Sequence, residues 1–262
     1  MTDLDAPPVL DIQRAALFLD LDGTLADLQL RPEAVFIPAT TLDTLAALQS
    51  KGAQLAVVSG RRIDDIDRLL APLRLPAAGI HGAERRDAEG RVERVSLDAG
   101  LLSAIEEELE TACRELPGLR LESKGMAFAL HYRGAPERED DARRLAEACA
   151  NRHADLLRLQ PGKCVFELKP RSASKGAAIE AFMAQRPFAG RQAVFVGDDL
   201  TDEAAFPVVE GLGGLSIRVG PGDTCARYRL EGVADVARWL RGLLGPSVSE
   251  GGINKNLGGE LI

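Results

Sequence analysis

One apolar segment followed directly by Asp20-Leu21-Asp22 constrains this chain more than any other feature. Ala15–Leu19 holds five apolar residues, which indicates a strand buried on both faces of a parallel sheet. Asp20 and Asp22 come next, and because alternate side chains of an extended segment point the same way, the two carboxylates can face one space. Two close carboxylates repel each other unless a proton or a metal cation lies between them. The segment therefore predicts a cation, a shared proton or both, and an acidic Asp-Gly turn without further function is the simpler alternative.

Apolar strands and amphipathic helices alternate along the first part of the chain. A helical pattern precedes a second apolar strand over residues 54–58, and another helical pattern follows it. Strands and helices that alternate over short connections are typical of a parallel sheet with right-handed crossovers. We therefore predict an α/β fold with a doubly wound, mostly parallel sheet. In such a sheet ligands bind beyond the carboxyl ends of the strands, which places Asp20, Asp22 and Ser59 along one edge.

The pattern changes in the middle of the chain. Residues 97–170 show helix, hairpin, helix and hairpin in turn, which predicts an α+β unit with an antiparallel sheet. The doubly wound pattern resumes at Ser174. We therefore predict a core made of residues 1–96 and 171–245, with residues 97–170 inserted as a second domain. Residues 246–262 are rich in glycine and lack periodicity, so we expect a flexible tail.

Charge and composition limit the partners of the chain. A formal net charge of −8 over 262 residues leaves no excess of basic residues, whereas nucleic-acid binding needs a basic surface. No segment has the length of a membrane-spanning helix and the N-terminus is unlike a signal peptide, so we expect a cytoplasmic protein. The four cysteines are scattered, which favours neither a zinc site nor disulfides. A small phosphorylated substrate remains compatible with this composition, and the pattern indicates no particular oligomeric state.

Two positions near helix starts suit an anion. Lys175 follows Ser174, a predicted helix cap, so its cation lies in a first helical turn, where the helix dipole disfavours positive charge by about 0.3–1 kcal/mol. A bound phosphate would compensate for this. Ser59 lies between a strand and a helix, where its hydroxyl can donate to a phosphoryl oxygen. A solvated lysine and a simple helix cap are the alternatives for these two residues.

An acidic run follows the predicted strand Ala193–Val196. Asp198 and Asp199 come before the expected helix start. Asp202 lies in the expected first helical turn, where acidic residues are common because the helix dipole favours negative charge. Several carboxylates at a strand end opposite Asp20 would repel one another without a divalent cation. The run lacks the glycine that a calcium-binding EF-hand loop has at its sixth position. Coordination by a few oxygen ligands and water favours Mg²⁺.

These segments occur in the order Asp-x-Asp-Gly-Thr, Ser, Lys and Gly-Asp-Asp, each after an apolar strand or at a helix start. Together they resemble the four motifs of the haloacid dehalogenase-type phosphatases over residues 15–245. The resemblance implies that the insertion between the second and third motifs is the larger, type 2 cap of that superfamily. It also implies that Asp20 attacks phosphorus to form an aspartyl-phosphate, and that Asp22 acts as general acid and then as general base.

The same resemblance implies roles for the other core residues. Those that would bind the phosphoryl oxygens are Ser59, Gly60 and Lys175. Those that would hold Mg²⁺ are the carboxylate of Asp20, the backbone carbonyl of Asp22 and the carboxylate of Asp198, with Asp199 and Asp202 ordering coordinated water or the Lys175 ammonium.

Segments in and beside the insertion are similar to signature segments of the trehalose-6-phosphate phosphatases. These segments are His81-Gly82-Ala83-Glu84, Glu122-Ser123-Lys124-Gly125, His131-Tyr132-Arg133, Lys163 and Glu167-Leu168-Lys169-Pro170. Charged donors and acceptors on a lid suit the hydroxyls of a disaccharide. The resemblance implies trehalose 6-phosphate as the substrate, with sugar-binding residues His81, Gly82, Glu84, Glu122, Lys124, Arg133, Lys163 and Glu167. The chain departs from fungal relatives at Val165, where they carry an asparagine, and a set of solvated charges on a half-exposed sheet is the simpler alternative.

Three other functions fit parts of the pattern. A phosphatase for another phosphosugar, such as sucrose phosphate, would share the core motifs and differ in the cap. A phosphosugar mutase would use similar groups but would have to protect its acyl phosphate from water. A phosphoaccepting switch domain would need Asp20 but no acid at Asp22. The cap residues and Asp22 therefore favour a phosphatase for trehalose 6-phosphate.

Overall fold

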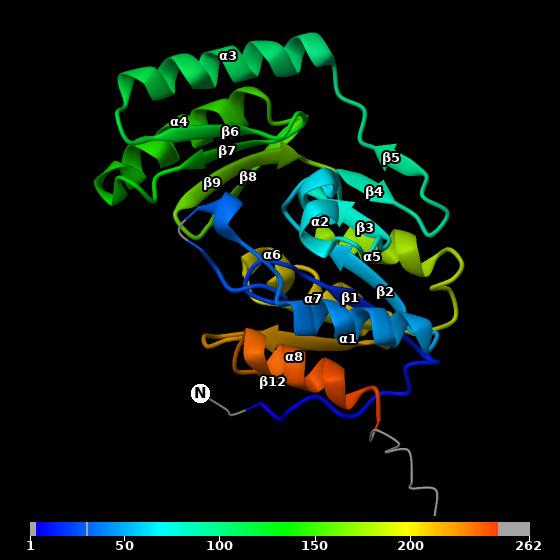
Figure 1. Ribbon diagram of the computed structural model, residues 1–262. Coiled ribbons are helices and arrows are strands. Elements are labelled where there is room, and N and C mark those ends of the chain that lie inside the picture. Colours follow the sequence, from blue (N-terminus) through cyan, green and yellow to red (C-terminus); the bar gives the residue numbers. More distant parts are fainter. Residues whose placement is uncertain (1–3, 30, 246–262) are drawn as a thin grey trace, which may run out of the picture.

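The centre of the molecule is a mixed sheet of eight strands, seen in a computed structural model that describes residues 4–29 and 31–245 (Figure 1). In spatial order the strands are β12 (Tyr228–Leu230), β11 (Leu215–Val219), β10 (Gln192–Gly197), β1 (Ala15–Leu19), β2 (Gln54–Val58), β3 (Ala77–Gly79), β4 (Glu84–Arg86) and β5 (Val92–Arg94). Neighbouring strands from β12 to β3 are parallel, and β4 and β5 add an antiparallel edge. The predicted doubly wound, mostly parallel sheet is confirmed.

Helices cover both faces of this sheet, so every residue of β1 is buried. The helices packed on one face are α1 (Ala39–Ser50), α2 (Ile63–Leu70) and α8 (Val233–Gly242). Those packed on the other face are α5 (Lys175–Met183) and α7 (Phe206–Gly211). Leu17 and Leu19 belong to the first core and Ala16 and Phe18 to the second. A strand with two buried faces needs no polar alternation, which explains the continuous apolar sequence of β1.

The register of the strands brings three strand ends to the same edge. β1 pairs with β10 from Ala15 opposite Gln192 to Leu19 opposite Val196, and it pairs with β2 on its other side. The segments that follow β1, β2 and β10 therefore leave the sheet at neighbouring points. The short helix α6 (Leu200–Glu203) begins just after β10.

A separate antiparallel sheet is formed within the predicted insertion. Its strands, in spatial order, are β6 (Arg120–Ser123), β7 (Phe128–His131), β9 (Val165–Pro170) and β8 (Leu157–Gly162). Two helices, α3 (Ala99–Glu115) and α4 (Glu139–Arg152), pack on one face and share a core with the sheet. Figure 1 shows the sheet between these helices and the central sheet. We call residues 97–170 the cap unit, and its division from the core as a domain stays a prediction.

The short elements at the edges of the fold carry little sequence signal. The three-residue strands β4, β5 and β12 hold too few side chains for a periodic pattern. The strand β3 ends at Gly79, because the 3₁₀ helix η2 (Ile80–Gly82) begins at the next residue. The other 3₁₀ helices are η1 (Pro32–Ala34) and η3 (Pro136–Arg138).

Two further expectations concern the ends and the helices of the chain. The predicted tail, residues 246–262, lies outside the described residues. Within the part of the chain that the structure describes, none of the helices combines the length and the apolar character needed to cross a membrane.

Candidate active site

The turn after β1 places Asp20 at the edge of the sheet. The Asp20 N–H donates to the carbonyl of Val196 at 3.0 Å, so the pairing of β1 with β10 continues by one residue. Asp20 is 3% exposed, and Leu21 turns back into the core. Gly23 has a φ of +81°, and a Cβ there would lie 2.2 Å from an oxygen of Asp198. Glycine is therefore required both for the turn and for the approach of Asp198.

The turn after β10 is built from its own carboxylates. Oδ2 of Asp202 accepts from the backbone N–H groups of Asp198 at 2.9 Å and Asp199 at 3.0 Å. Asp199 in turn accepts from the backbone N–H groups of Thr201 at 2.7 Å and Asp202 at 3.2 Å, which forms a capping box at the start of α6. A Cβ on Gly197 would lie 2.2 Å from Cγ of Asp202, so only glycine fits. These bonds fix the position of Asp198 beside the end of β1.

Lys175 joins the two turns. Ser174 caps α5 by accepting from the N–H of Ala177 at 3.0 Å, as predicted. Nζ of Lys175 lies 2.9 Å from Oδ1 of Asp20 and 2.7 Å from Oδ1 of Asp202. Burial would lower the pKa of Lys175, but the charges of Asp20 and Asp202 raise that pKa well above its ordinary value. Two carboxylates therefore offset the unfavourable position of this cation at a helix start, before any phosphate binds.

Three buried carboxylates form a group that suits a divalent cation. Ligand oxygens of Asp20, Asp198 and Asp202 all lie within 4.8 Å of one another. Burial raises the pKa of Asp20 well above its ordinary value, raises the pKa of Asp198, and raises the pKa of Asp202 to about 7. Each shift reflects the cost of burying negative charge, which a cation would offset. Carboxylate oxygens are the donors that Mg²⁺ prefers.

The three carboxylates differ in what they can still bind. Asp202 uses Oδ1 for Lys175 and Oδ2 for two backbone N–H groups. Within residues 4–29 and 31–245, Oδ2 of Asp20 and Oδ1 of Asp198 accept no hydrogen bond. Asp20 and Asp198 therefore fit as direct ligands of a metal, whereas Asp202 holds Lys175 and the turn in place.

Ser59 lies at the end of β2 and is 1% exposed. Its N–H donates to the carbonyl of Ala78 at 2.9 Å, and its Oγ accepts from the N–H of Arg61 at 3.2 Å. The N-cap of α2 is Arg62, so Ser59 does not cap this helix. The simpler explanation of Ser59 as a helix cap is therefore wrong, and its hydroxyl proton can point into the space beside Asp20.

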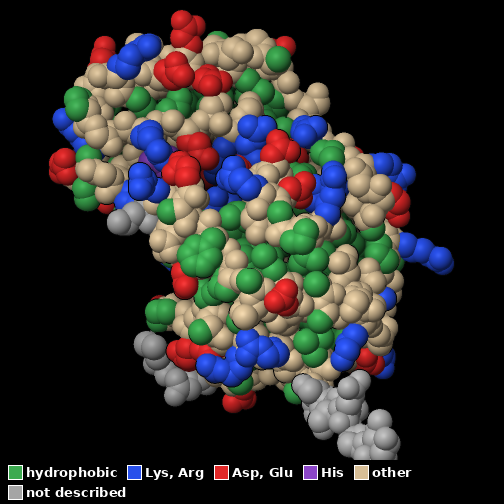
Figure 2. Space-filling model, in the orientation of Figure 1, with side chains coloured by type: hydrophobic (Ala, Val, Ile, Leu, Met, Phe, Trp, Pro, Cys, Tyr) green, Lys and Arg blue, Asp and Glu red, His purple; other side chains and the backbone are tan. Residues whose placement is uncertain are grey.

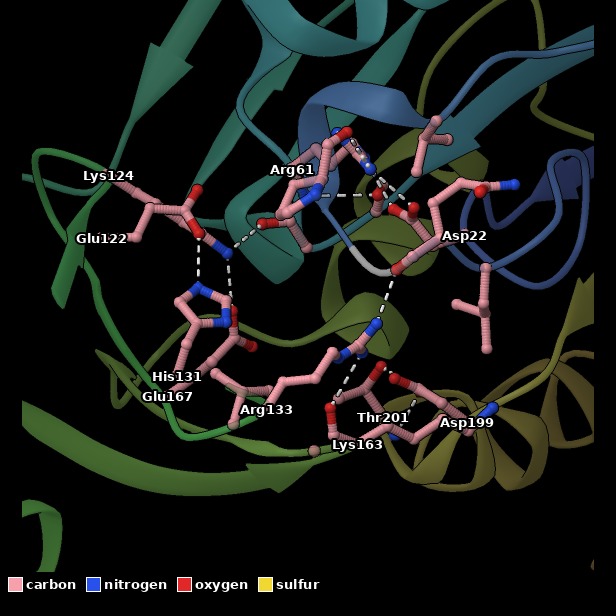
Figure 3. A pocket seen from close by; sticks show the side chains of 18 of the residues that line it. Asp22, Arg61, Glu122, Lys124, His131, Arg133, Lys163, Glu167, Asp199 and Thr201 are labelled. Carbon is pink, nitrogen blue, oxygen red and sulfur yellow. Dashed lines mark hydrogen bonds and ion pairs between the residues drawn. The ribbon is translucent and has the colours of Figure 1, made fainter. Parts of the chain in front are cut away.

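Asp22 faces a cation. Nε of Arg61 donates to Oδ2 of Asp22 and Nη2 donates to Oδ1, each at 2.7 Å (Figure 3). Burial would lower the pKa of Arg61, but the hydrogen bonds and charge of Asp22 raise it. The Asp22 carboxylate is not part of the acidic group around Asp20.

His81 connects the core to the cap unit. It lies in η2 with a φ of +54°, and its Nε2 lies 2.6 Å from Oε2 of Glu167 in β9. Lys124, in the turn between β6 and β7, donates to Oε1 of Glu167 at 2.6 Å and to the carbonyl of Gly60 at 3.0 Å. A Cβ on Gly60 would lie 2.7 Å from the His81 ring, so this position requires glycine. The second core motif and the cap unit therefore meet through direct polar contacts.

Burial and these contacts together set the charge states of His81 and Glu167. Burial lowers the pKa of His81 to about 4, so the ring is neutral at pH 7. Burial would raise the pKa of Glu167, but Lys124 and His81 lower it well below its ordinary value. Because Glu167 is ionised, the neutral ring carries its proton on Nε2. Nδ1 of His81 is then a buried acceptor, and it has no partner among the described residues.

Two other cap residues reach the core. Nζ of Lys163 donates to Oδ2 of Asp198 at 2.7 Å. Nη1 of Arg133 donates to the carbonyl of Gln29 at 2.6 Å, and its Nη2 donates to the carbonyl of Lys163 at 3.2 Å (Figure 3). The β8–β9 turn and the end of β7 therefore close over the carboxyl edge of the central sheet.

One cavity of about 840 Å³ connects the core motifs to the cap unit. Figure 2 shows acidic and basic side chains gathered where the cap unit meets the core. The predicted site residues that line the cavity are Asp20, Asp22, Ser59, Gly60, His81, Glu122, Lys124, Arg133, Lys163, Glu167, Lys175, Asp198 and Asp199. The cavity therefore has carboxylates and Lys175 at one end and polar cap side chains at the other.

Comparison with known proteins identifies the family. Residues 18–233 match the family described as trehalose-phosphatase. The trehalose-6-phosphate phosphatase of Escherichia coli (strain K12) is 50% identical over 227 residues, which cover 86% of this chain and 85% of that protein. The chain belongs to the trehalose-phosphatase family.

Solved structures share the fold of this trehalose-phosphatase family member. A trehalose-6-phosphate phosphatase related protein has a TM-score of 0.75 at 27% identity, with 87% of this chain and 96% of that chain covered. A haloacid dehalogenase-like hydrolase from B. subtilis has a TM-score of 0.62 at 18% identity, with 88% of this chain and 99% of that chain covered, which shows the fold alone. The haloacid dehalogenase-like fold expected from the order of the motifs is confirmed.

Two residues that the family resemblance had assigned to the sugar lie elsewhere. Glu84 is 4% exposed, and its carboxylate accepts from the N–H of Ile63 at 2.6 Å and from Nε of Arg94 at 3.2 Å. A Cβ on Gly82 would lie 2.6 Å from the carbonyl of Ser174, so Gly82 packs η2 against the start of α5. Neither residue lines the cavity, so the structure does not bring them to the predicted sugar-binding wall, and their contact with substrate stays a prediction. Both hold in place the segment that carries His81.

The sequence analysis assigned no role to three residues that line the cavity, Arg61, His131 and Gln160. Arg61 follows Ser59-Gly60, and nothing in the sequence indicates which residue it contacts. His131 lines the cavity, and its Nε2 lies 2.7 Å from Oε2 of Glu122. Gln160 lines it too, because the register of β8 and β9 sets it opposite Glu167. Alternation along the cap strands could have pointed to the last two, since residues that share a face recur every two positions.

Proposed function

We propose that this chain is a magnesium-dependent phosphatase that removes phosphate from trehalose 6-phosphate through an aspartyl-phosphate. One observation carries the proposal. Asp20 lies between Lys175 and Asp198 at the floor of a cavity whose opposite wall is made of polar side chains of the cap unit. Membership of the trehalose-phosphatase family supports this choice of substrate.

Asp20 would be the nucleophile. It is buried at the end of a rigid central strand, so its carboxylate has a defined direction. Its ionised form is stabilised by Lys175 at 2.9 Å, which opposes the effect of burial on its pKa. Attack on phosphorus breaks the bond to the sugar oxygen and forms an acyl phosphate, which water then hydrolyses.

The phosphoryl group would be bound from two sides. The hydroxyl and neighbouring backbone of Ser59 and Gly60 lie on the β2 side, and Lys175 lies on the α5 side. Donors held in place before the reaction stabilise the charge that spreads over the phosphoryl oxygens. The carboxylate of Asp20, the backbone carbonyl of Asp22 and the carboxylate of Asp198 would hold Mg²⁺. When bound, Mg²⁺ would neutralise charge on the phosphoryl oxygens.

Asp22 would give a proton to the departing sugar oxygen and later take one from the attacking water. From the sequence we expect a proton or a cation between Asp20 and Asp22, whereas the group in contact with the Asp22 carboxylate is Arg61. Its side chain is 30% exposed and lines the cavity, so it can still reach a leaving group.

The cap unit would select the sugar. Glu122, Lys124, Arg133, Lys163 and Glu167 line the cavity from β6 to β9 and offer charged donors and acceptors to hydroxyl groups. His81 adds a core residue to this wall. We infer that residues 97–170 act as a specificity domain on a catalytic core of residues 1–96 and 171–245.

A panel of phosphate esters tests this proposal. Phosphate release from trehalose 6-phosphate, sucrose 6-phosphate and a hexose phosphate is measured with Mg²⁺ and with a chelator. We expect the highest kcat/KM on trehalose 6-phosphate and loss of activity with chelator. Faster turnover of sucrose 6-phosphate would contradict the substrate assignment. Isomerised sugar phosphate without phosphate release would show a mutase.

A further inference from the structure

Arg61 lines the cavity but has no role in the proposed reaction. It follows Ser59 and Gly60 at the end of β2, and its side chain is 12% exposed. A cation at this depth is stable only where its donors are satisfied. The groups that satisfy it therefore indicate what Arg61 does.

The side chain of Arg61 holds Asp22 in a two-point contact. Nε and Nη2 donate to the two oxygens of Asp22 at 2.7 Å each. Nη1 and Nη2 also donate to the carbonyl of Pro32, at 3.2 and 3.3 Å. A planar guanidinium bound through two parallel hydrogen bonds and a further acceptor has little freedom to rotate. The orientation of the Asp22 carboxylate is set by this contact.

The backbone of Arg61 is fixed as well. Its N–H donates to Oγ of Ser59 at 3.2 Å, and its carbonyl accepts from the N–H of Ile80 at 2.8 Å. Arg61 therefore links the turn that would bind phosphate to the side chain that would serve the leaving group.

We propose that Arg61 is the positioning residue for Asp22, which it orients toward the leaving oxygen of the substrate. A two-point contact uses one lone pair on each Asp22 oxygen and leaves the other lone pair of each oxygen free to carry or accept a proton. As the bond between phosphorus and the sugar oxygen breaks, its electron pair stays on that oxygen, which takes the proton from Asp22. The bond from Asp20 to phosphorus forms, and the Asp22 carboxylate left behind stays bound to Arg61. This inference rests on the role proposed for Asp22.

The role predicts a dependence on the leaving group. An alkoxide such as the sugar oxygen is strongly basic and needs a proton as it departs, whereas a p-nitrophenolate leaves without one. Loss of the Arg61 contact should therefore slow alkyl esters far more than activated aryl esters. A purely structural role, or direct binding of phosphate by Arg61, would slow all esters alike. Direct binding of the sugar would leave sugar-free esters unchanged.

The experiment uses sugar-free esters in the full-length, Mg²⁺-loaded enzyme. kcat/KM is measured for a series of substituted phenyl phosphates and a simple alkyl phosphate, because this parameter covers only the steps through departure of the leaving group. The variants are Arg61→Met, which removes the donors, and Arg61→Lys, which keeps the charge but cannot make the two-point contact. The matched control is Arg62→Met, because Arg62 is the adjacent arginine, is half exposed and lies 3.5 Å from Asp64 on the surface. Thermal melting confirms that each variant is folded.

We expect both Arg61 variants to lose about 10- to 100-fold in kcat/KM on the alkyl phosphate and less than about 3-fold on p-nitrophenyl phosphate. Arg62→Met should match the wild type on both. Equal losses across the series, or no loss on the alkyl phosphate, would overturn the inference. If Arg61→Lys matched the wild type in kcat/KM on the alkyl phosphate, the two-point contact would not be required, and that part of the inference would be wrong.

Asp22→Asn separates this inference from the proposed function. If Asp22→Asn makes kcat/KM depend more steeply on the leaving group and the Arg61 variants do not, only the role proposed for Arg61 is wrong. If Asp22→Asn slows all esters alike, the acid role of Asp22 is wrong and the role of Arg61 falls with it. If the wild type does not hydrolyse trehalose 6-phosphate, but the Arg61 variants show a steeper leaving-group dependence on sugar-free esters, the substrate assignment is wrong and the inference about Arg61 stands.

Discussion

The buried His81 should make the stability of the protein depend on pH in a predictable way. His81 is 5% exposed, and burial lowers its pKa from an ordinary 6.5 to about 4. Well above pH 6.5 the ring is neutral in both the folded and the unfolded chain, so its contribution is constant. As the pH falls, the unfolded chain binds a proton near pH 6.5 and the folded chain only near pH 4. Proton binding therefore favours the unfolded state, and stability is lost between these values.

The magnitude follows from the two pKa values. A fall from 6.5 to about 4, at about 1.4 kcal/mol for each pKa unit, corresponds to a loss of ~3 kcal/mol in the free energy of unfolding by pH 4. Titration of the carboxylates around Asp20 overlaps with this range, so the contribution of His81 must be isolated as a difference between proteins.

The assay compares the wild type with His81→Gln, whose amide can still donate to Glu167 but does not titrate. Urea unfolding is measured from pH 8 to pH 4 without Mg²⁺. We expect the difference in unfolding free energy between the two proteins to stay constant above pH 7.5. Between pH 7.5 and pH 4 the wild type should lose ~3 kcal/mol relative to His81→Gln. His153→Gln, at the end of α4, serves as the control histidine. A difference that stays within about 0.5 kcal/mol over the whole range would refute this reasoning.

Three further predictions test the site. Glu122→Gln should lower kcat/KM on trehalose 6-phosphate about 10-fold or more, because a charge-assisted contact is lost, and should leave p-nitrophenyl phosphate within 2-fold; equal losses would count against a sugar role. Asp198→Asn should raise the Mg²⁺ concentration for half-maximal activity about 10-fold and weaken the rise in melting temperature with Mg²⁺, and unchanged Mg²⁺ dependence would exclude it as a ligand. Glu84→Ala should cost ~2 kcal/mol in urea unfolding, because the buried N–H of Ile63 loses its acceptor, while KM for trehalose 6-phosphate stays within 2-fold. A tenfold change in that KM would indicate that Glu84 contacts the substrate.

The placement of the core motifs could be predicted because it depends on strand order alone. Apolar strands that alternate with helices must end at one edge of a parallel sheet, so Asp20, Ser59 and Asp198 had to come close together once each was placed after its strand. The structure brings Asp198 within reach of a cation shared with Asp20. This placement does not depend on side-chain conformation.

Side-chain partners could not be predicted from the pattern. Glu84 and His81 are three residues apart in the same signature segment, yet the short strand β4 turns Glu84 into the core while η2 aims His81 at the cavity. Arg61 has no local partner in the sequence, because Asp22 is 39 residues away and meets it only through the pairing of β1 with β2. Such contacts depend on backbone turns that residue spacing does not specify.

Rapid acid quench of the enzyme with labelled trehalose 6-phosphate and Mg²⁺ tests the central claim most directly. The enzyme is digested after the first turnover, and the phosphorylated peptide is identified by mass spectrometry. The account predicts phosphate on Asp20, lost in Asp20→Asn. Phosphate on any other residue, or free phosphate released in the first turnover by Asp20→Asn at the wild-type rate, would contradict it.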